Sequence, residues 1–206
     1  IGTSWVSAAN VLLIQQHLGA HASGIYTTAA DLMGVLLVVA QATAIVLFGQ
    51  LVTEGVDGPW DKQLHVLVWL TSLMLVASLC AAVVAPWVVP PVLGERFREV
   101  VPVWRVLLLG VAPQTVAVLM APQWVARGRF LEATVLAVGV GLLTVACNAW
   151  LIPRAGILAA AWVTAASSLA LMLANVAFAV HITRGLRRAG RPPNGCARSG
   201  PAAPGL

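Results

Sequence analysis

The residues of this sequence that could do chemistry are polar side chains set inside long apolar stretches. Arg105 stands out, because it lies about one and a half helical turns into the apolar stretch at residues 100–125. A guanidinium suits phosphate because its planar fork donates paired hydrogen bonds. We therefore expect Arg105 to bind a phosphate-bearing substrate in a membrane cavity, or else to snorkel to the outer headgroups.

Other polar side chains at membrane depth are also candidates for a substrate cavity. Asp31 lies near the outer end of the apolar stretch at residues 26–52, where it could pair with Arg105, take part in ion coupling or remain a solvated helix-end acid. The uncharged candidates could line a hydrophilic route or form hydrogen bonds between helices. They are Asn10, Gln15, Gln16, Gln41 and Gln114.

The sequence shows no set of residues typical of an enzyme. It has no nucleophile–base set, Gly-rich phosphate loop, HExxH motif or paired cysteines, so we expect no enzymatic activity, cofactor or metal. Cys80 and Cys147 lie inside apolar runs and are interpreted as packing residues. Arg129 and Glu132, three residues apart, predict a local ion pair at the inner surface.

The elements that carry these residues are those of a membrane protein. Of the 206 residues, 60% are hydrophobic and only 9% are charged, whereas a soluble domain is about 25% charged. So few charges could not cover a soluble surface. Lipid is therefore expected to be part of the solvent.

Six apolar segments fill the chain up to about Ile182, at residues 1–18, 26–52, 64–89, 100–125, 130–152 and 157–182. The later five are long enough to cross a hydrocarbon core of about 30 Å. Turn and loop signals lie between the segments, at residues 19–24, 54–62, 90–91 with 94–99, 127–129 and 153–156. The predicted fold is all-α: an integral membrane bundle of six transmembrane helices without β-sheet. Because the first segment is short and begins at Ile1, we expect a fragment or a chain numbered from an internal residue.

Residues 183–206 form a basic, Pro/Gly-rich tail that cannot build a core and is predicted to be disordered. If the tail lies in the cytoplasm, six spans place Lys62, Arg127 and Arg129 on the same side. Eight cations then lie inside and three outside, which favours both ends in the cytoplasm of a multi-pass cell-membrane protein. Trp60, Trp87, Trp124 and Trp150 lie near the predicted span ends, as an aromatic belt would place them.

Three stretches carry a resemblance to a known family. The first is residues 12–19 with the turn Gly24-Ile25-Tyr26-Thr27-Thr28-Ala29, which resembles a "G-x-Y-x-x-A" turn between two helices. The second is residues 92–97, similar to a "Leu-Gly-x-x-Phe" loop. The third and most specific is residues 148–161 with Thr164, similar to an "N-x-x-L-I-P-x-x-G-x-x-G-A-A" junction, although Leu158-Ala159 stands where Gly is common.

These stretches resemble the oligosaccharide flippases of the multidrug/oligosaccharidyl-lipid/polysaccharide exporter superfamily. The resemblance implies that residues 1–182 form the C-terminal lobe of a two-lobe transporter. Its implied partners are membrane lipid, a lipid-linked oligosaccharide and an N-terminal lobe, and nucleic acid is not expected. The implied function is to flip that oligosaccharide across the cytoplasmic membrane by alternating access. Alternatives are a drug/cation antiporter or lipid II flippase of the same superfamily, a polytopic glycosyl or acyl transferase, or a structural membrane subunit.

Overall fold

The computed structural model describes residues 4–54, 60–126 and 128–188, and this described part of the chain is helical with no strand. The prediction of an all-α fold is therefore confirmed. The elements follow one another as α1 (Ser4–Glu54), α2 (Trp60–Leu93), the 3-10 helix η1 (Glu95–Glu99), α3 (Val100–Leu108), α4 (Val111–Ala126) and α5 (Phe130–Arg188).

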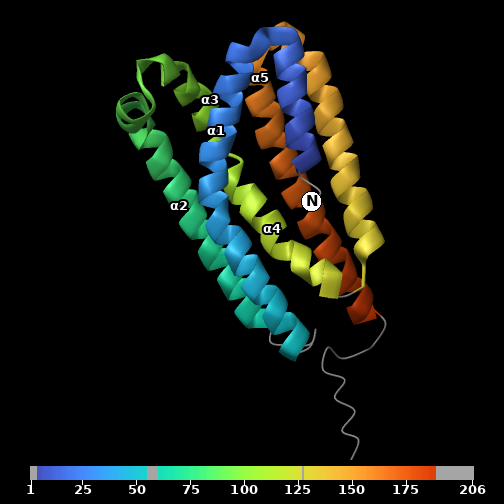
Figure 1. The fold of residues 1–206 in the computed structure, drawn as a ribbon. Coiled ribbons are helices and arrows are strands. Elements are labelled where there is room, and N and C mark those ends of the chain that lie inside the picture. Colours follow the sequence, from blue (N-terminus) through green and yellow to red (C-terminus); the bar gives the residue numbers. More distant parts are fainter. Residues whose placement is uncertain (1–3, 55–59, 127, 189–206) are drawn as a thin grey trace, which may run out of the picture.

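The two longest elements, α1 and α5, are each made of two helical arms joined at one glycine. Gly19 breaks α1 with φ 88° and ψ 175°, and Gly156 breaks α5 with φ 71° and ψ −160°. Only glycine adopts these backbone angles readily, because a Cβ atom would collide with the chain. Both elements turn back on themselves as hairpins (Figure 1). The turns predicted at residues 19–24 and 153–156 exist, but helix resumes directly after each glycine.

The hairpins lie side by side, with α4 packed against both of them and α2 packed on α3 and α4. Both hairpin turns lie at one end of the bundle, with α3 (Figure 1). The opposite end of the bundle is approached by the end of α1, the start of α2, the end of α4 and both ends of α5 (Figure 1). Most of the segment ends predicted to share one side of a membrane therefore lie toward one end of the bundle, whereas α1 begins nearer its middle (Figure 1).

The segment predicted as one helix over residues 100–125 is in fact bent. Phe97–Leu108 and Val111–Pro122 meet at 51°. At the bend, a Cβ on Gly110 would lie 3.1 Å from the Leu107 carbonyl oxygen and 3.4 Å from the Ala165 Cα. The absence of a side chain thus lets the bend approach the second arm of α5 closely, which hydropathy alone does not reveal.

The prolines of α2 do not end the helix where expected. The predicted break at residues 90–91 is wrong, because α2 continues through Pro86, Pro90 and Pro91 to Leu93. It ends at Gly94, which has φ 96° and donates its N–H to the Pro90 carbonyl oxygen at 2.9 Å. Each proline lacks an N–H and so leaves the carbonyl four residues earlier without its helical partner, yet the helix continues through all three.

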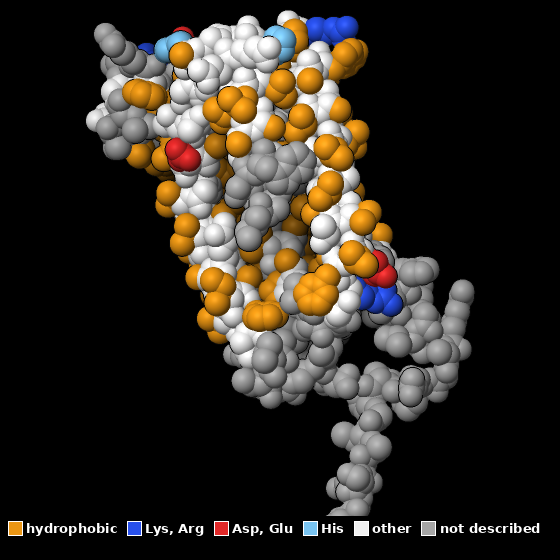
Figure 2. Space-filling model, turned by 45° about the vertical axis from the view of Figure 1, so that its right-hand side comes forward, with side chains coloured by type: hydrophobic (Ala, Val, Ile, Leu, Met, Phe, Trp, Pro, Cys, Tyr) orange, Lys and Arg blue, Asp and Glu red, His pale blue; other side chains and the backbone are white. Residues whose placement is uncertain are grey.

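Three helical stretches are long and apolar enough to cross a membrane, namely Val6–Gly49, Leu64–Pro91 and Phe130–Ala177, and the bent pair around Gly110 makes a fourth if it is taken as one. Their surface is apolar: Val35, Trp69 and Leu131 are 68%, 64% and 81% exposed. Figure 2 shows hydrophobic side chains along the flanks and most of the charged ones toward the ends. A face of this kind fits contact with lipid.

The structure can be compared with the predicted aromatic belt and with the predicted boundary between the last helix and the tail. Trp87 and Trp150 are exposed, as an aromatic belt requires, but Trp124 is buried inside the protein. The boundary predicted at residue 182 falls inside α5, which continues to Arg188. Residues 189–206 lie outside the described residues, so the disordered tail stays a prediction.

Candidate functional site

Two buried asparagines join the first arms of the hairpins. Asn10 in α1 is 2% exposed and Asn148 in α5 is fully buried. The Nδ2 atom of Asn148 donates a hydrogen bond to the Oδ1 atom of Asn10 at 2.9 Å. Asn10 was predicted as a cavity residue or an interhelical hydrogen-bonding residue, and the structure places it in the second arrangement.

A second polar pair joins the second arms of the same hairpins. The hydroxyl of Tyr26 lies 2.9 Å from the Thr164 hydroxyl. Thr164 donates its own hydrogen to the Ala160 carbonyl oxygen at 2.9 Å. Since a threonine hydroxyl carries one hydrogen, Tyr26 is the donor to Thr164.

The two pairs form one polar cluster, which we define as Asn10, Asn148, Tyr26 and Thr164; the first three are buried and Thr164 is half-buried. The Asn10 side chain also lies close to the Tyr26 hydroxyl, so the cluster brings together polar groups from the four arms of both hairpins. The Oδ1 atom of Asn148 is buried and has no hydrogen-bond partner in the described part of the chain. The cluster therefore connects the bundle while leaving one acceptor unsatisfied.

The cluster relates α1 and α5 as two copies of one motif. Asn10 pairs with Asn148 and Tyr26 with Thr164, and each pair is separated by 138 residues. The sequence Asn-x-x-Leu-Ile occurs at residues 10–14 and at 148–152, a few residues before the two hinge glycines. Contacts between equivalent positions are typical of a two-fold relationship. This repeat was the sequence signal that could have revealed the pairing, and our sequence reading missed it.

Arg105 is held by the helix beside it. Its Nε atom donates a hydrogen bond to the Ala82 carbonyl oxygen of α2 at 2.9 Å. Pro86 follows Ala82 by four residues and has no N–H, so the usual helical partner of that carbonyl is missing. Arg105 thus caps a carbonyl that a proline has left open, and its side chain is exposed rather than buried.

The fixed guanidinium keeps its phosphate-binding capacity. Nε uses one of five N–H donors, and no hydrogen bond from either Nη atom is found within the described residues. The two Nη groups form the outer edge of a planar fork whose orientation is set by the Ala82 contact. Arg105 lies about five residues beyond the start of α3, roughly 7.5 Å along its axis.

The other predicted site residues do not gather around Arg105. Asp31 is exposed and, within the described residues, forms no ion pair with Arg105. Gln15 and Gln16 are exposed in the last turn before Gly19, at the hairpin end of the bundle. The remaining two glutamines are Gln41, exposed on the second arm of α1, and Gln114, half-buried just after the bend.

The ends of the bundle carry charged and aromatic contacts. Arg129 donates to the Glu132 carboxylate at 3.2 Å, which confirms the predicted ion pair. At the hairpin end, His21 lies 3.6 Å from the Glu99 carboxylate, and the Arg154 guanidinium lies 4.1 Å from the centroid of the Trp150 ring. These contacts are exposed or half-exposed, so each adds little stability.

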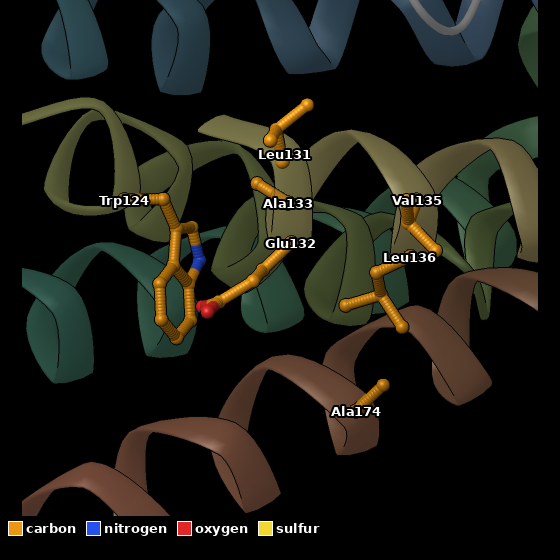
Figure 3. A pocket seen from close by; sticks show the side chains of 7 residues that line it. All are labelled: Trp124, Leu131, Glu132, Ala133, Val135, Leu136 and Ala174. Carbon is orange, nitrogen blue, oxygen red and sulfur yellow. The ribbon is translucent and has the colours of Figure 1, made fainter. Parts of the chain in front are cut away.

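A cavity of about 470 Å³ lies beside the Arg129–Glu132 pair (Figure 3). It is lined by Trp124, Leu131, Glu132, Ala133, Val135, Leu136 and Ala174. Below it, Trp124 donates its indole N–H to the Asn175 Oδ1 atom at 2.8 Å, and Asn175 donates to the Leu171 carbonyl oxygen. The sequence carries no local signal for this cavity, because its walls come from segments about 40 residues apart.

Within the residues that the structure describes, no three His, Cys, Asp or Glu side chains gather to hold a metal ion. Comparison of the chain with protein-family models, with curated proteins and with solved structures finds no match.

Proposed function

We propose that this protein is one lobe of a transporter that flips a lipid-linked oligosaccharide across the cytoplasmic membrane by alternating access. The observation that carries the proposal is the position of Arg105. An exposed guanidinium is anchored in the wall of an apolar helical bundle by a carbonyl that Pro86 leaves open. A residue held in this way is ready to bind an anion.

The charge at this site favours an anionic substrate. Lipid-linked sugars carry phosphate groups, and a guanidinium with two outward N–H groups matches phosphate oxygens. Asp31 was the residue expected to neutralise Arg105, and the two form no ion pair in the described structure. The positive charge is thus available to a ligand, which argues against a cationic drug as the substrate.

The helix architecture supports movement of a lobe as a body. The Asn10–Asn148 and Tyr26–Thr164 contacts tie the two hairpins together, so they would move as a unit. If each arm of α1 and α5 crosses the membrane once, and α2 and the bent α3–α4 pair once each, the chain makes six crossings. Alternating access is commonly a rocking of such bodies around a site near the midplane.

The proposal also includes a second lobe, surrounding lipid and an orientation in the membrane. A second lobe is needed to form the other wall of the cavity, and membrane lipid surrounds the apolar flanks. The end of the bundle at which α5 begins and ends faces the cytoplasm, as the distribution of Lys and Arg favours.

The test is the location of the lipid-linked oligosaccharide when the protein is depleted. In spheroplasts from depleted cells, the oligosaccharide should accumulate where an added impermeant glycosidase cannot reach it. Restoring the protein should return it to the accessible outer leaflet. Unchanged accessibility, together with a loss of efflux of a cationic dye, would contradict the proposal and favour a drug exporter.

A further inference from the structure

The cavity is lined by residues near the end of α4, near the start of α5 and in the second arm of α5. The end of α4 and the start of α5 lie toward the end of the bundle opposite the hairpin turns and α3 (Figure 1), so the cavity is separate from Arg105. Its wall is almost entirely apolar, and Glu132 is the one charged residue among the seven that line it. The volume of about 470 Å³ falls within the range of sites that hold small molecules or lipid segments. An apolar cavity with one carboxylate is suited to an amphiphile.

The carboxylate of Glu132 is directed at the aromatic wall. Figure 3 shows it extending toward the Trp124 indole, with Leu136 on its other side and Ala174 below. The Oε2 atom accepts the 3.2 Å bond from Arg129, whereas Oε1 has no hydrogen bond within the described residues. A carboxylate oxygen beside an indole ring is a good setting for an ammonium group, which gains both an ion pair and a cation–π contact.

The cavity opens toward lipid. Leu131 and Val135, which line it, are 81% and 71% exposed, and both lie on the first arm of α5. In a bilayer an acyl chain gains nothing by exchanging lipid for an apolar wall, so selection must come from the headgroup. The occupant is therefore expected to carry its polar group next to Glu132.

We propose that this cavity binds a phospholipid with a primary ammonium headgroup, phosphatidylethanolamine, from the leaflet that borders this end. The ammonium would donate to the Glu132 carboxylate beside Trp124, and one acyl chain would cover Leu136 and Ala174. The positive charge of Arg129 attracts the phosphate of the same headgroup. A quaternary headgroup fits less well because it has no N–H to donate to Glu132.

Lipid retention by the purified full-length protein tests the proposal. The protein is incubated with equal amounts of phosphatidylethanolamine, phosphatidylcholine and phosphatidylglycerol with identical acyl chains, and retained lipid is measured by native mass spectrometry. We expect phosphatidylethanolamine to exceed the other two by about five- to tenfold, as one hydrogen bond of ordinary net strength provides. Glu132→Gln should bring phosphatidylethanolamine down to the level of phosphatidylcholine. Ala174→Phe, which fills the cavity, should lower the retention of all three.

Glu99→Gln is the matched control, because Glu99 is also an exposed acid in an ion pair but lies at the other end of the bundle. It should leave the lipid preference unchanged. Each variant is first checked for a single elution peak and for native helix content. Equal retention of the three lipids by the unmodified protein would overturn the proposal. So would an unchanged preference in a folded Glu132→Gln variant.

Discussion

The Nδ2 atom of Asn148 donates a hydrogen bond to Asn10 across the interface between α5 and α1, at 2.9 Å and in a fully buried position. Hydrogen bonds of this kind hold membrane helices together because lipid offers no competing partner. The pair also fixes the register between the two hairpins, since Tyr26 and Thr164 then meet at the equivalent position of the second arms.

Each single substitution in this pair should therefore lower the free energy of unfolding. The sum of the two losses should exceed the loss in the double variant. Asn148→Leu leaves Asn10 buried without its partner, and Asn10→Leu does the reverse. In a double-mutant cycle we expect a coupling free energy of about 0.6–1.7 kcal/mol. The measurement is reversible unfolding in detergent, followed by circular dichroism. Strictly additive effects would show that the two side chains do not interact.

Gly19, at the hinge of α1, can be compared with Gly24, which lies in the helix that follows it. Gly19→Ala should destabilise the protein by about 1–3 kcal/mol, because the hinge angles are open almost only to glycine. Gly24→Ala is the control: Gly24 is helical, and a Cβ there meets nothing within 4 Å. It should be neutral or stabilise the helix by up to about 1 kcal/mol. Equal effects of both changes on the unfolding midpoint would argue against the hinge.

The contact between Arg105 and Ala82 predicts a dependence on Pro86. Arg105→Gln should destabilise the protein by about 1 kcal/mol, because it uncovers the Ala82 carbonyl. In a Pro86→Ala background the alanine N–H at that position satisfies the carbonyl, so the same change should have less effect. The free energy of unfolding is compared among the unmodified protein, the two single variants and the double variant. If Arg105→Gln is equally destabilising in both backgrounds, the capping role is wrong.

The orientation of the bundle can be measured with the native cysteines. Cys80 and Cys147 are replaced by alanine, which leaves Cys196 in the tail as the target, and a second protein carries Glu99→Cys in place of Cys196. With both ends in the cytoplasm, an impermeant thiol reagent added to intact cells should label position 99 and spare Cys196. The reverse labelling pattern would invert the topology.

The sequence was informative wherever a local signal decides the structure. Apolar length predicted the helical segments, and glycine predicted both hairpin turns, because the backbone angles at Gly19 and Gly156 exclude other residues. The Arg129–Glu132 pair followed from a spacing of three residues. These features depend on neighbours in the chain alone.

The features that were missed depend on distant segments. The bend at Gly110 follows from close approach to Ala165, and the contact of Arg105 joins helices 23 residues apart in the sequence. Hydropathy also could not distinguish Trp124, buried against Asn175, from a tryptophan at the lipid interface. The candidate site was predicted as a set of residue types, but which of them meet is decided by tertiary packing.

The central claim is that the anchored guanidinium of Arg105 binds substrate phosphate, and export of the oligosaccharide by two Arg105 variants tests it most directly. Arg105→Lys keeps the charge but loses the planar fork, and Arg105→Gln loses both. Outer-leaflet oligosaccharide is measured in cells that hold equal amounts of each protein in the membrane. The account predicts that Arg105→Gln abolishes export and that Arg105→Lys retains part of it. Near-normal export by both variants at matched abundance would contradict it.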